Sequence, residues 1–224
     1  MTAWKTWTMP ATRPAADELV GRHVRLSPLD PADSPELYAA IAHPDVFASG
    51  FGGGPAGLPR DLAVFEAFAA SQFVPGPRAL PWTIRLASGP DAGTVVGTTT
   101  LGDLDLANEG AHIGWTAYDP RVWATAVNPE AKLLLLDLAF SHGFSRVKLQ
   151  ADSQNARSRA AIEKLGATFE GVLRHHRRRA DLSWRDTAVY SILVEEWPGV
   201  RAGLEARLAA WDDRAVVLGA PSVE

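Results

Sequence analysis

Hydrophobic and polar residues alternate in several short segments of the chain and follow a helical period in others. Alternation is typical of half-buried strands, and a strand pattern is found at 23–26, 82–86, 94–104, 112–118, 147–152, 168–178 and 184–193. Apolar residues recur with the period of a helix at 34–41, 61–72, 129–142 and 196–210. We therefore expect a mixed α/β (α+β) fold in which about seven strands form a central sheet flanked by helices.

The segment 111–166 combines elements in an order that can build a cofactor site. Strand 112–118 is followed by a loop, an apolar helix, strand 147–152 and a second helix that ends at Gly166. Asn128 fits the N-cap of the apolar helix, with Pro129 at its first helical position. Free backbone N–H groups and the helix dipole at such a start suit a phosphate or pyrophosphate. We expect strand 147–152 to pair parallel to an earlier strand through a right-handed crossover.

Composition narrows the class of protein. The chain has 224 residues, 46% of them hydrophobic, which is enough for one sizeable core. Its net charge of −4 argues against general nucleic-acid binding. The absence of cysteine excludes disulfides, thiolate metal sites and a cysteine nucleophile. No apolar run approaches membrane-spanning length, so we expect no membrane partner and a cytoplasmic location.

The chain divides into one domain with two appendages. Residues 1–20 mix proline and small residues with Trp4 and Trp7, and we expect an N-terminal arm that docks through these two indoles. Residues 21–197 form the domain, and residues 198–224 form a C-terminal helix and tail.

Two motifs indicate a family. Asn155, Ser158, Lys164 and Gly166 have the spacing of an Asn, small-residue, Lys, Gly motif, and the loop 121–126 stands in place of an Arg/Gln-x-x-Gly-x-Gly/Ala loop. Through these residues the chain resembles the GNAT superfamily of N-acetyltransferases, in particular the branch of ribosomal-protein N-terminal (alanine/serine) acetyltransferases. The resemblance implies a mostly antiparallel sheet with a V-shaped splay between its fourth and fifth strands.

The resemblance also implies a co-substrate and its binding residues. Acetyl-CoA would donate an acetyl group to a primary amine, of a small molecule or a peptide N-terminus, by direct attack and without a metal. A homodimer is the expected assembly. Residues expected to bind acetyl-CoA come from the fourth strand, the following loop and the second helix: Thr116, Ala117, Tyr118, Arg121, Val122, Trp123, Ala124, Thr125, Ala126, Val127, Asn128, Asn155 and Ser158. Ala124 departs from the family glycine, and its methyl group restricts positive φ and crowds an approaching phosphate.

Candidate catalytic residues follow from the chemistry of amine acetylation. A base must take a proton from the ammonium group, and an acid must protonate the leaving thiolate. His112 is the leading base, because imidazole titrates near neutrality, and Glu109 competes with it. Ile162 stands where many relatives carry a tyrosine acid, so Ser158 and Tyr190 are the candidate acids.

The run 174–179 is the candidate acceptor-binding segment. Strand alternation places Arg174 and His176 on one face, and we expect both, with Trp115, to contact the acceptor. The adjacent His175 and His176 point in opposite directions without a third ligand nearby, so we reject a metal site. Two alternatives stay open: a transferase for succinyl-CoA or another acyl-CoA, and a non-catalytic acyl-CoA-binding module.

Overall fold

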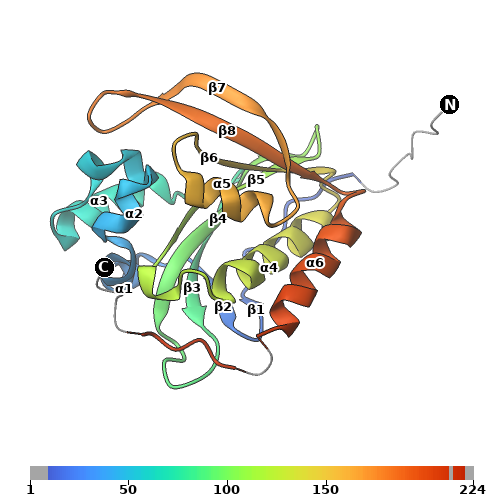
Figure 1. Ribbon diagram of the computed structural model, residues 1–224, viewed down its shortest axis with the longest axis horizontal. Helices are drawn as coiled ribbons and strands as arrows, with labels where there is room; N and C mark the ends of the chain where they lie inside the picture. The colour runs from blue at the N-terminus through green and yellow to red at the C-terminus, as the bar shows by residue number, and fades with distance from the viewer. Residues whose placement is uncertain (1–9, 212–213, 220–224) are drawn as a thin grey trace.

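The computed structural model describes residues 10–211 and 214–219, so the predicted docking of Trp4 and Trp7 lies outside the described residues. A twisted sheet runs through the molecule between two groups of helices (Figure 1). In the described part of the chain the sheet has eight strands in the order β1-β2-β3-β4-β5-β6-β8-β7. The strands are β1 (Leu19–Val20), β2 (Val24–Pro28), β3 (Leu80–Leu86), β4 (Val95–Asp105), β5 (Gly110–Tyr118), β6 (Arg146–Asp152), β7 (Thr168–Arg178) and β8 (Trp184–Leu193).

Helices cover both faces of this sheet. The α-helices are α1 (Ser34–Ile41), α2 (Pro44–Ala48), α3 (Leu62–Gln72), α4 (Val127–Ser141), α5 (Ala156–Glu163) and α6 (Trp197–Ala209). Short 3-10 turns join them: η1 (Pro31–Asp33), η2 (Phe51–Gly53), η3 (Pro55–Gly57) and η4 (Pro120–Val122). One hydrophobic core includes buried residues of α4 and α6, and a second includes Phe47 of α2 and Phe65 of α3. No helix in the described ranges combines the length and apolarity needed to cross a bilayer.

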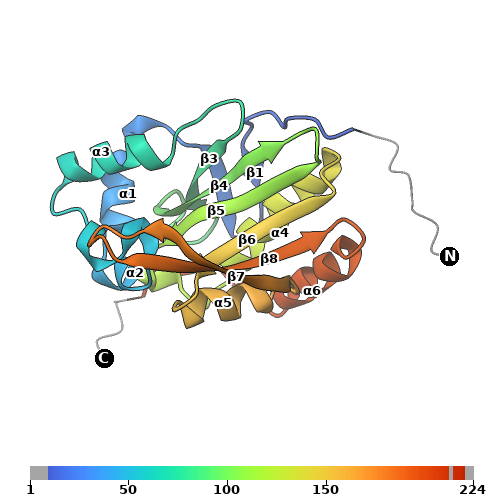
Figure 2. The same cartoon turned by 90° about the horizontal axis from the view of Figure 1, so that it is seen from above.

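The sheet is antiparallel except at β5 and β6, which run parallel and separate along their length. Their pairing joins Gly110 to Arg146, Ala111 to Val147 and His112 to Lys148, and it ends there. Beyond His112, β5 stays paired with β4, while β6 stays paired with β8 as far as Asp152. The two strands therefore open into a V, visible from above in Figure 2. The predicted fold class and its splay are confirmed.

Glu130 joins the start of α4 to the first long strand. Its carboxylate accepts the backbone N–H groups of Arg22, His23 and Val24 at 2.8, 2.6 and 2.7 Å. A Cβ atom on Gly21 would lie 2.5 Å from this carboxylate, so the chain needs glycine there to pass it. These contacts hold the start of α4 against the start of β2. The β5–α4 loop, which leads directly into α4, is thereby held in place as well.

Two details of the predicted elements differ from the structure. The short strand β1 and helix α2 lacked a pattern long enough to be recognised. The prediction that Asn128 caps the apolar helix is wrong, because α4 begins at Val127. The Thr125 hydroxyl accepts the Val127 N–H at 3.3 Å, and the Asn128 side chain instead accepts a hydrogen bond from Tyr118 at 3.1 Å.

Candidate active site

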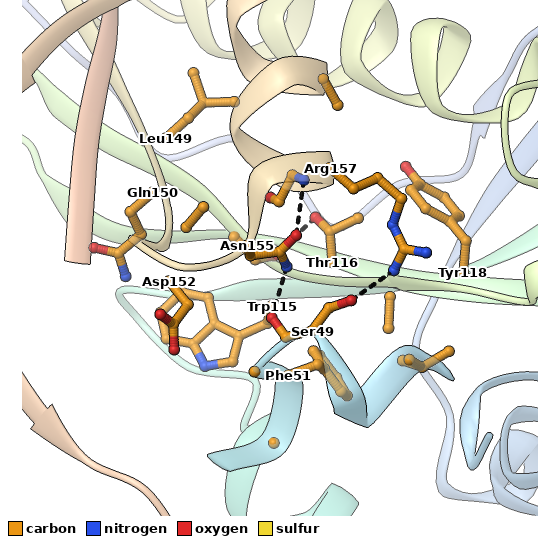
Figure 3. A pocket seen from close by; sticks show the side chains of 18 of the residues that line it. Ser49, Phe51, Trp115, Thr116, Tyr118, Leu149, Gln150, Asp152, Asn155 and Arg157 are labelled. Atoms are coloured by element: carbon orange, nitrogen blue, oxygen red, sulfur yellow. Dashed lines mark hydrogen bonds between the residues drawn. The ribbon is translucent and has the colours of Figure 1, made fainter. Parts of the chain in front are cut away.

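A cleft of about 630 Å³ occupies the opening between β5 and β6. Its walls come from β5, β6, the β5–α4 loop, the N-terminal parts of α4 and α5, the segment that follows α2, and the β7–β8 hairpin. Figure 3 shows Trp115 and Thr116 of β5 across the cleft from Gln150 and Asp152 of β6. The cleft thus gathers segments that lie far apart in the sequence.

A bulge in β5 shapes the cleft floor. The register between β4 and β5 shifts between Thr98 and Thr100, and Trp115 opposite has a φ of 48°. A non-glycine residue in the left-handed region costs energy and persists only where its surroundings hold it. Here the Trp115 ring packs against His112, with the ring centroids 5.1 Å apart. The bulge therefore turns both side chains toward the cleft, which both residues line.

The β5–α4 loop presents free backbone donors beside the cleft. Ala124 has a φ of 59°, a conformation that glycine adopts more readily than alanine. Within the described residues, no protein group accepts the backbone N–H of Ala124, Ala126 or Asn128. Three such donors at a helix start fit a phosphate or pyrophosphate group. The residues present at this loop therefore fit the phosphates of an acyl-CoA.

The Arg121 and Trp123 side chains brace this loop. The Arg121 guanidinium pairs with the buried Asp119 carboxylate at 2.6 Å, which raises the pKa of Arg121. Trp123 donates its indole N–H to the Tyr118 carbonyl at 3.1 Å, and the Arg157 guanidinium stacks over its ring at 3.4 Å from the centroid. Burial raises the pKa of the Tyr118 hydroxyl, so it stays protonated and donates to Asn128.

The start of α5 forms the opposite wall. The Asn155 side chain caps α5 by accepting the Ser158 N–H at 2.9 Å, and it donates to the Ser49 carbonyl at 2.6 Å. Figure 3 shows both contacts, with Arg157 reaching from α5 toward the Ser49 hydroxyl. Ser158 lines the cleft, and its hydroxyl has no hydrogen-bond partner in the described segments. Ile162 lines the cleft one turn later.

His112 lies at the point where β5 and β6 separate. Only 1% of the residue is exposed, its Nδ1 is 3.2 Å from the Asp103 carboxylate, and its buried Nε2 has no hydrogen-bond partner in the described part of the chain. Burial lowers the pKa of His112 below its ordinary value, opposed by Asp103 and assisted by Lys148. The pKa of Asp103 is held well below its usual range, chiefly by His112 and also by Lys148. The imidazole is therefore neutral at pH 7 and able to accept a proton.

Sequence reasoning missed Lys132, a buried cation in the same cleft. Lys132 lies one helical turn after Asn128 on α4 and donates to the Thr116 hydroxyl at 2.9 Å. No carboxylate in the described ranges pairs with it, and burial lowers the pKa of Lys132 to about 7. One feature of the sequence could have identified this residue. It is the single lysine of a leucine-rich helix, and it lies on the same helix face as Asn128.

Four of the residues predicted for catalysis or acceptor binding do not line the cleft, and neither do four of the predicted acetyl-CoA residues: Arg121, Thr125, Ala126 and Val127. Glu109 forms a turn whose carbonyl accepts the N–H groups of Ser145 and Arg146. The Tyr190 hydroxyl is held by Glu163 at 2.8 Å and Arg159 at 3.1 Å, and the ring is fully buried. The other two, Arg174 and His176, point elsewhere along β7 and do not line the cleft.

A bulge in β7 explains why the cleft is lined by other basic residues than the predicted ones. The predicted alternation of this segment fails because the register with β8 shifts between Leu173 and Arg177, and His175 has a φ of 49°. The Asp186 carboxylate accepts the His175 N–H at 2.7 Å and stabilises this bulge. The bulge brings another part of the hairpin to the cleft, where the lining residues are Arg177, Arg178, Arg179 and, on β8, Arg185.

The comparisons with known proteins agree with this geometry. A family model described as an acetyltransferase (GNAT) domain matches residues 23–168. A T. thermophilus protein assigned as an acetyltransferase is 35% identical, with a TM-score of 0.74, and the match covers 91% of this chain and 100% of that chain. A GCN5-related N-acetyltransferase from Brucella melitensis is 29% identical, with a TM-score of 0.78, and the match covers 91% and 90% of the two chains.

A more distant likeness supports the fold alone. Mycobacterium smegmatis RimJ, solved in complex with CoA-disulfide, is 22% identical with a TM-score of 0.62, and the match covers 85% of this chain and 92% of that chain. No curated protein matches the chain in sequence.

The chain therefore belongs to the GNAT acetyltransferase family. It is an acetyl-CoA-dependent N-acetyltransferase, an enzyme class whose acyl donor is acetyl-CoA.

Proposed function

We propose that this enzyme transfers the acetyl group of acetyl-CoA to a primary amine that meets the thioester beside His112. The observation that carries the proposal is the cleft between β5 and β6, which has free backbone N–H donors beside one wall and a buried imidazole nitrogen without a hydrogen-bond partner among the described residues. The loop residues Ala124, Ala126 and Asn128 would hold the pyrophosphate through their backbone N–H groups.

In this reaction the nitrogen lone pair forms a new N–C bond, the C–S bond of the thioester breaks, and the thiol leaves. Acetyl-CoA supplies the reactive carbonyl carbon. His112 Nε2 accepts the proton that the ammonium group must lose, because a neutral buried imidazole is available at pH 7. Asp103 stabilises the imidazolium that results, since its carboxylate lies 3.2 Å from Nδ1.

Ser158 is the proposed relay of the proton that the leaving thiolate takes up: its hydroxyl donates to the thiolate while it accepts the second proton that the attacking nitrogen loses. Its hydroxyl lines the cleft at the start of α5 and is not engaged by another described residue. Tyr190 is not part of the proposal, because its hydroxyl already donates a hydrogen bond to Glu163 and accepts one from Arg159.

Acyl transfer is tested by measuring thiol release from acetyl-CoA across a panel of amines, with the acetylated product identified by mass spectrometry. We expect Ser158→Ala to lower kcat by about a hundredfold, with a small change in the dissociation constant of acetyl-CoA, since losing one positioned acid typically costs this much. Ser141→Ala is the matched control, because Ser141 is the last residue of α4 and its hydroxyl donates to the Leu138 carbonyl. Binding of acetyl-CoA without thiol release on any amine would contradict the proposal and favour a non-catalytic acyl-CoA-binding module.

A further inference from the structure

The β7–β8 hairpin places three guanidinium groups in the same wall of the cleft. Arg177 of β7 and Arg185 of β8 are direct cross-strand partners, and Arg179 follows Arg177 by two positions. Cross-strand partners share one face of a sheet, and so do residues two positions apart. All three arginines line the cleft.

One carboxylate lies near two of these three cations. Asp152 is the only acidic residue among the described residues that line the cleft, and its Oδ2 accepts Arg179 Nε at 3.2 Å and Arg179 Nη2 at 2.6 Å. Arg185 Nε is 3.9 Å from the same oxygen, too far for a hydrogen bond, and this buried atom has no hydrogen-bond partner within the described residues. Arg177 forms no ion pair with any described carboxylate.

This arrangement of charges is unfavourable within the protein itself. Like charges directly opposite each other on paired strands are destabilising. Burial lowers the pKa of Arg185, and Arg177 and Arg179 lower it further against the opposing effect of Asp152. An added anion would relieve both effects, and a planar guanidinium fork matches a carboxylate in a bidentate geometry.

The arginines lie on a different part of the cleft from the phosphate-binding loop. The free backbone donors belong to 124–128, after β5, whereas the arginines belong to the hairpin whose Ala180 N–H is accepted by the Gly53 carbonyl at 3.0 Å. The tip of the hairpin therefore lies beside the segment after α2 (Figure 1), and both segments line the cleft.

We propose that the acceptor is a primary amine that carries a carboxylate, and that Arg177 and Arg185 bind this carboxylate beside the Arg179–Asp152 pair. The inference rests on the proposed acetyl transfer and names its substrate class. The carboxylate takes no part in bond making: it fixes the acceptor so that its amine reaches the thioester next to His112. The carboxylate can belong to a small amino acid or to an acidic side chain of a peptide.

Matched acceptor pairs test this inference and separate the two sources. One arm compares γ-aminobutyrate with γ-aminobutyramide, in which the distant charge changes while the amine is nearly unaffected. The other arm compares two peptide amides that differ only by Glu or Gln at the second position. We expect kcat/KM to favour the acid by about tenfold to a hundredfold in one arm, as one or two charge-assisted hydrogen bonds would give.

Variants then assign the preference to the hairpin. Arg185→Gln should reduce the ratio of kcat/KM between acid and amide toward one, and Arg185→Lys should retain part of it because the charge remains. Arg60→Gln makes the same charge change at a residue whose side chain is 84% exposed and should keep the ratio of the wild type. Melting temperatures of all variants show whether each is folded, and calorimetry should give wild-type affinity for acetyl-CoA in Arg185→Gln.

The outcomes distinguish this inference from the proposed function. Equal turnover of acid and amide in both arms, or a preference that persists in Arg185→Gln, would overturn the inference and leave acetyl transfer standing. A loss of acetyl-CoA affinity in Arg185→Gln would also overturn it, because the arginines would then serve the donor. The inference would also be overturned if transfer from succinyl-CoA were faster than transfer from acetyl-CoA and if Arg185→Gln abolished this difference. No thiol release with any amine would contradict the proposed function itself.

Discussion

His112 shows how the surroundings of one residue set its chemistry. An exposed histidine would be half protonated near its ordinary pKa of 6.5, but burial at the base of the splay favours the neutral ring. Asp103 opposes this effect, so the imidazolium that forms during the reaction has a counter-charge 3.2 Å away. The residue therefore combines a neutral resting state with a stabilised protonated state.

The pH dependence of the reaction follows from this environment. The acidic limb of kcat/KM should lie below pH 6.5, because the pKa of His112 is lowered from that value, and His112→Gln should remove the limb with most of the rate. Two amines of different pKa separate this limb from the ionisation of the acceptor. His142→Gln is the control, since His142 lies at the end of α4 and contacts Leu138. A limb that persists unchanged in His112→Gln would show that His112 is not the base.

Asp103 gives a second test of the same assignment. Its carboxylate raises the pKa of His112, so Asp103→Asn should shift the acidic limb to lower pH and lower the rate. Lys148 should amplify the shift, because it lowers the pKa of His112 and would lose its 3.0 Å contact with Asp103. The measurement is the kcat/KM profile of wild type and variant on one amine. A shift toward higher pH would contradict the described geometry.

Lys132 makes stability depend on pH in a defined direction. Its folded pKa of about 7 lies below the ordinary 10.5, so between these values the unfolded chain binds more protons than the folded chain. Stability therefore rises with pH through this window, and the cost of burying the ammonium is fully present below it. Lys132→Met should raise the melting temperature at pH 6, and the gain should shrink as the pH rises through the window. A gain independent of pH would mean that Lys132 is not buried as a cation.

At the scale of elements, the β5–α4 loop depends on one strained residue. Ala124 occupies the left-handed region, which costs an L-residue roughly 1–2 kcal/mol, whereas glycine adopts it freely. Ala124→Gly should therefore keep or raise the melting temperature and tighten acetyl-CoA binding in calorimetry.

The matched control for this loop variant is the same substitution in a helix. Ala160 is exposed in α5, where Ala→Gly should cost roughly 1 kcal/mol. Opposite signs for Ala124→Gly and Ala160→Gly are expected in thermal unfolding. A destabilisation of similar size in both would contradict the left-handed conformation of Ala124.

Helix α4 depends in turn on Glu130. The carboxylate accepts three backbone N–H groups at the start of β2. Glu130→Gln replaces one accepting oxygen with an NH₂ group that faces these donors, and we expect a loss of about 3 kcal/mol or more in unfolding free energy. Chemical denaturation measures the change, with Glu66→Gln on α3 as an exposed control. A loss below about 1 kcal/mol would show that water replaces these contacts without difficulty.

The elements also show which parts of the structure a sequence pattern can predict. Strands and helices were predictable because their periodicity extends over many residues, as in β4 and α4. The start of α4 was not, since Asn128 suits an N-cap by residue type, whereas in the structure Ala126 is the N-cap and the Asn128 side chain accepts the Tyr118 hydroxyl. The bulge at His175 depends on Asp186 of the neighbouring strand, so alternation within β7 alone misplaced Arg174.

At the scale of the whole molecule, the candidate site was predictable only for those residues that a local sequence pattern identifies. The loop, Asn155, Ser158 and His112 follow one another in the segment 111–166, and local patterns marked them. Lys132, Asp103 and Arg185 gain their significance from burial and from partners in other elements, which no local pattern records. Tertiary contacts therefore decide the electrostatics of the cleft.

Assembly and domain boundaries stay predictions. The expectation of a homodimer is checked by sedimentation equilibrium, where a mass of twice the 24.1 kDa chain would support it.

The proposed N-terminal arm, residues 1–20, includes residues that contact the domain: Leu19 pairs with Leu26, and the Asp17 carbonyl accepts the Trp82 indole N–H at 3.1 Å. We expect removal of residues 1–20 to lower the melting temperature, because the buried indole of Trp82 would lose its hydrogen-bond acceptor.

The most direct test of the account is a crystal structure of the enzyme with acetyl-CoA. We expect electron density for the pantetheine between β5 and β6, with the pyrophosphate against the backbone of Ala124, Ala126 and Asn128 and the thioester beside His112 and Ser158. The side chains of Arg177 and Arg185 should remain free of the CoA phosphates. Density that places the pyrophosphate on these arginines, or the acetyl group away from His112, would contradict the account.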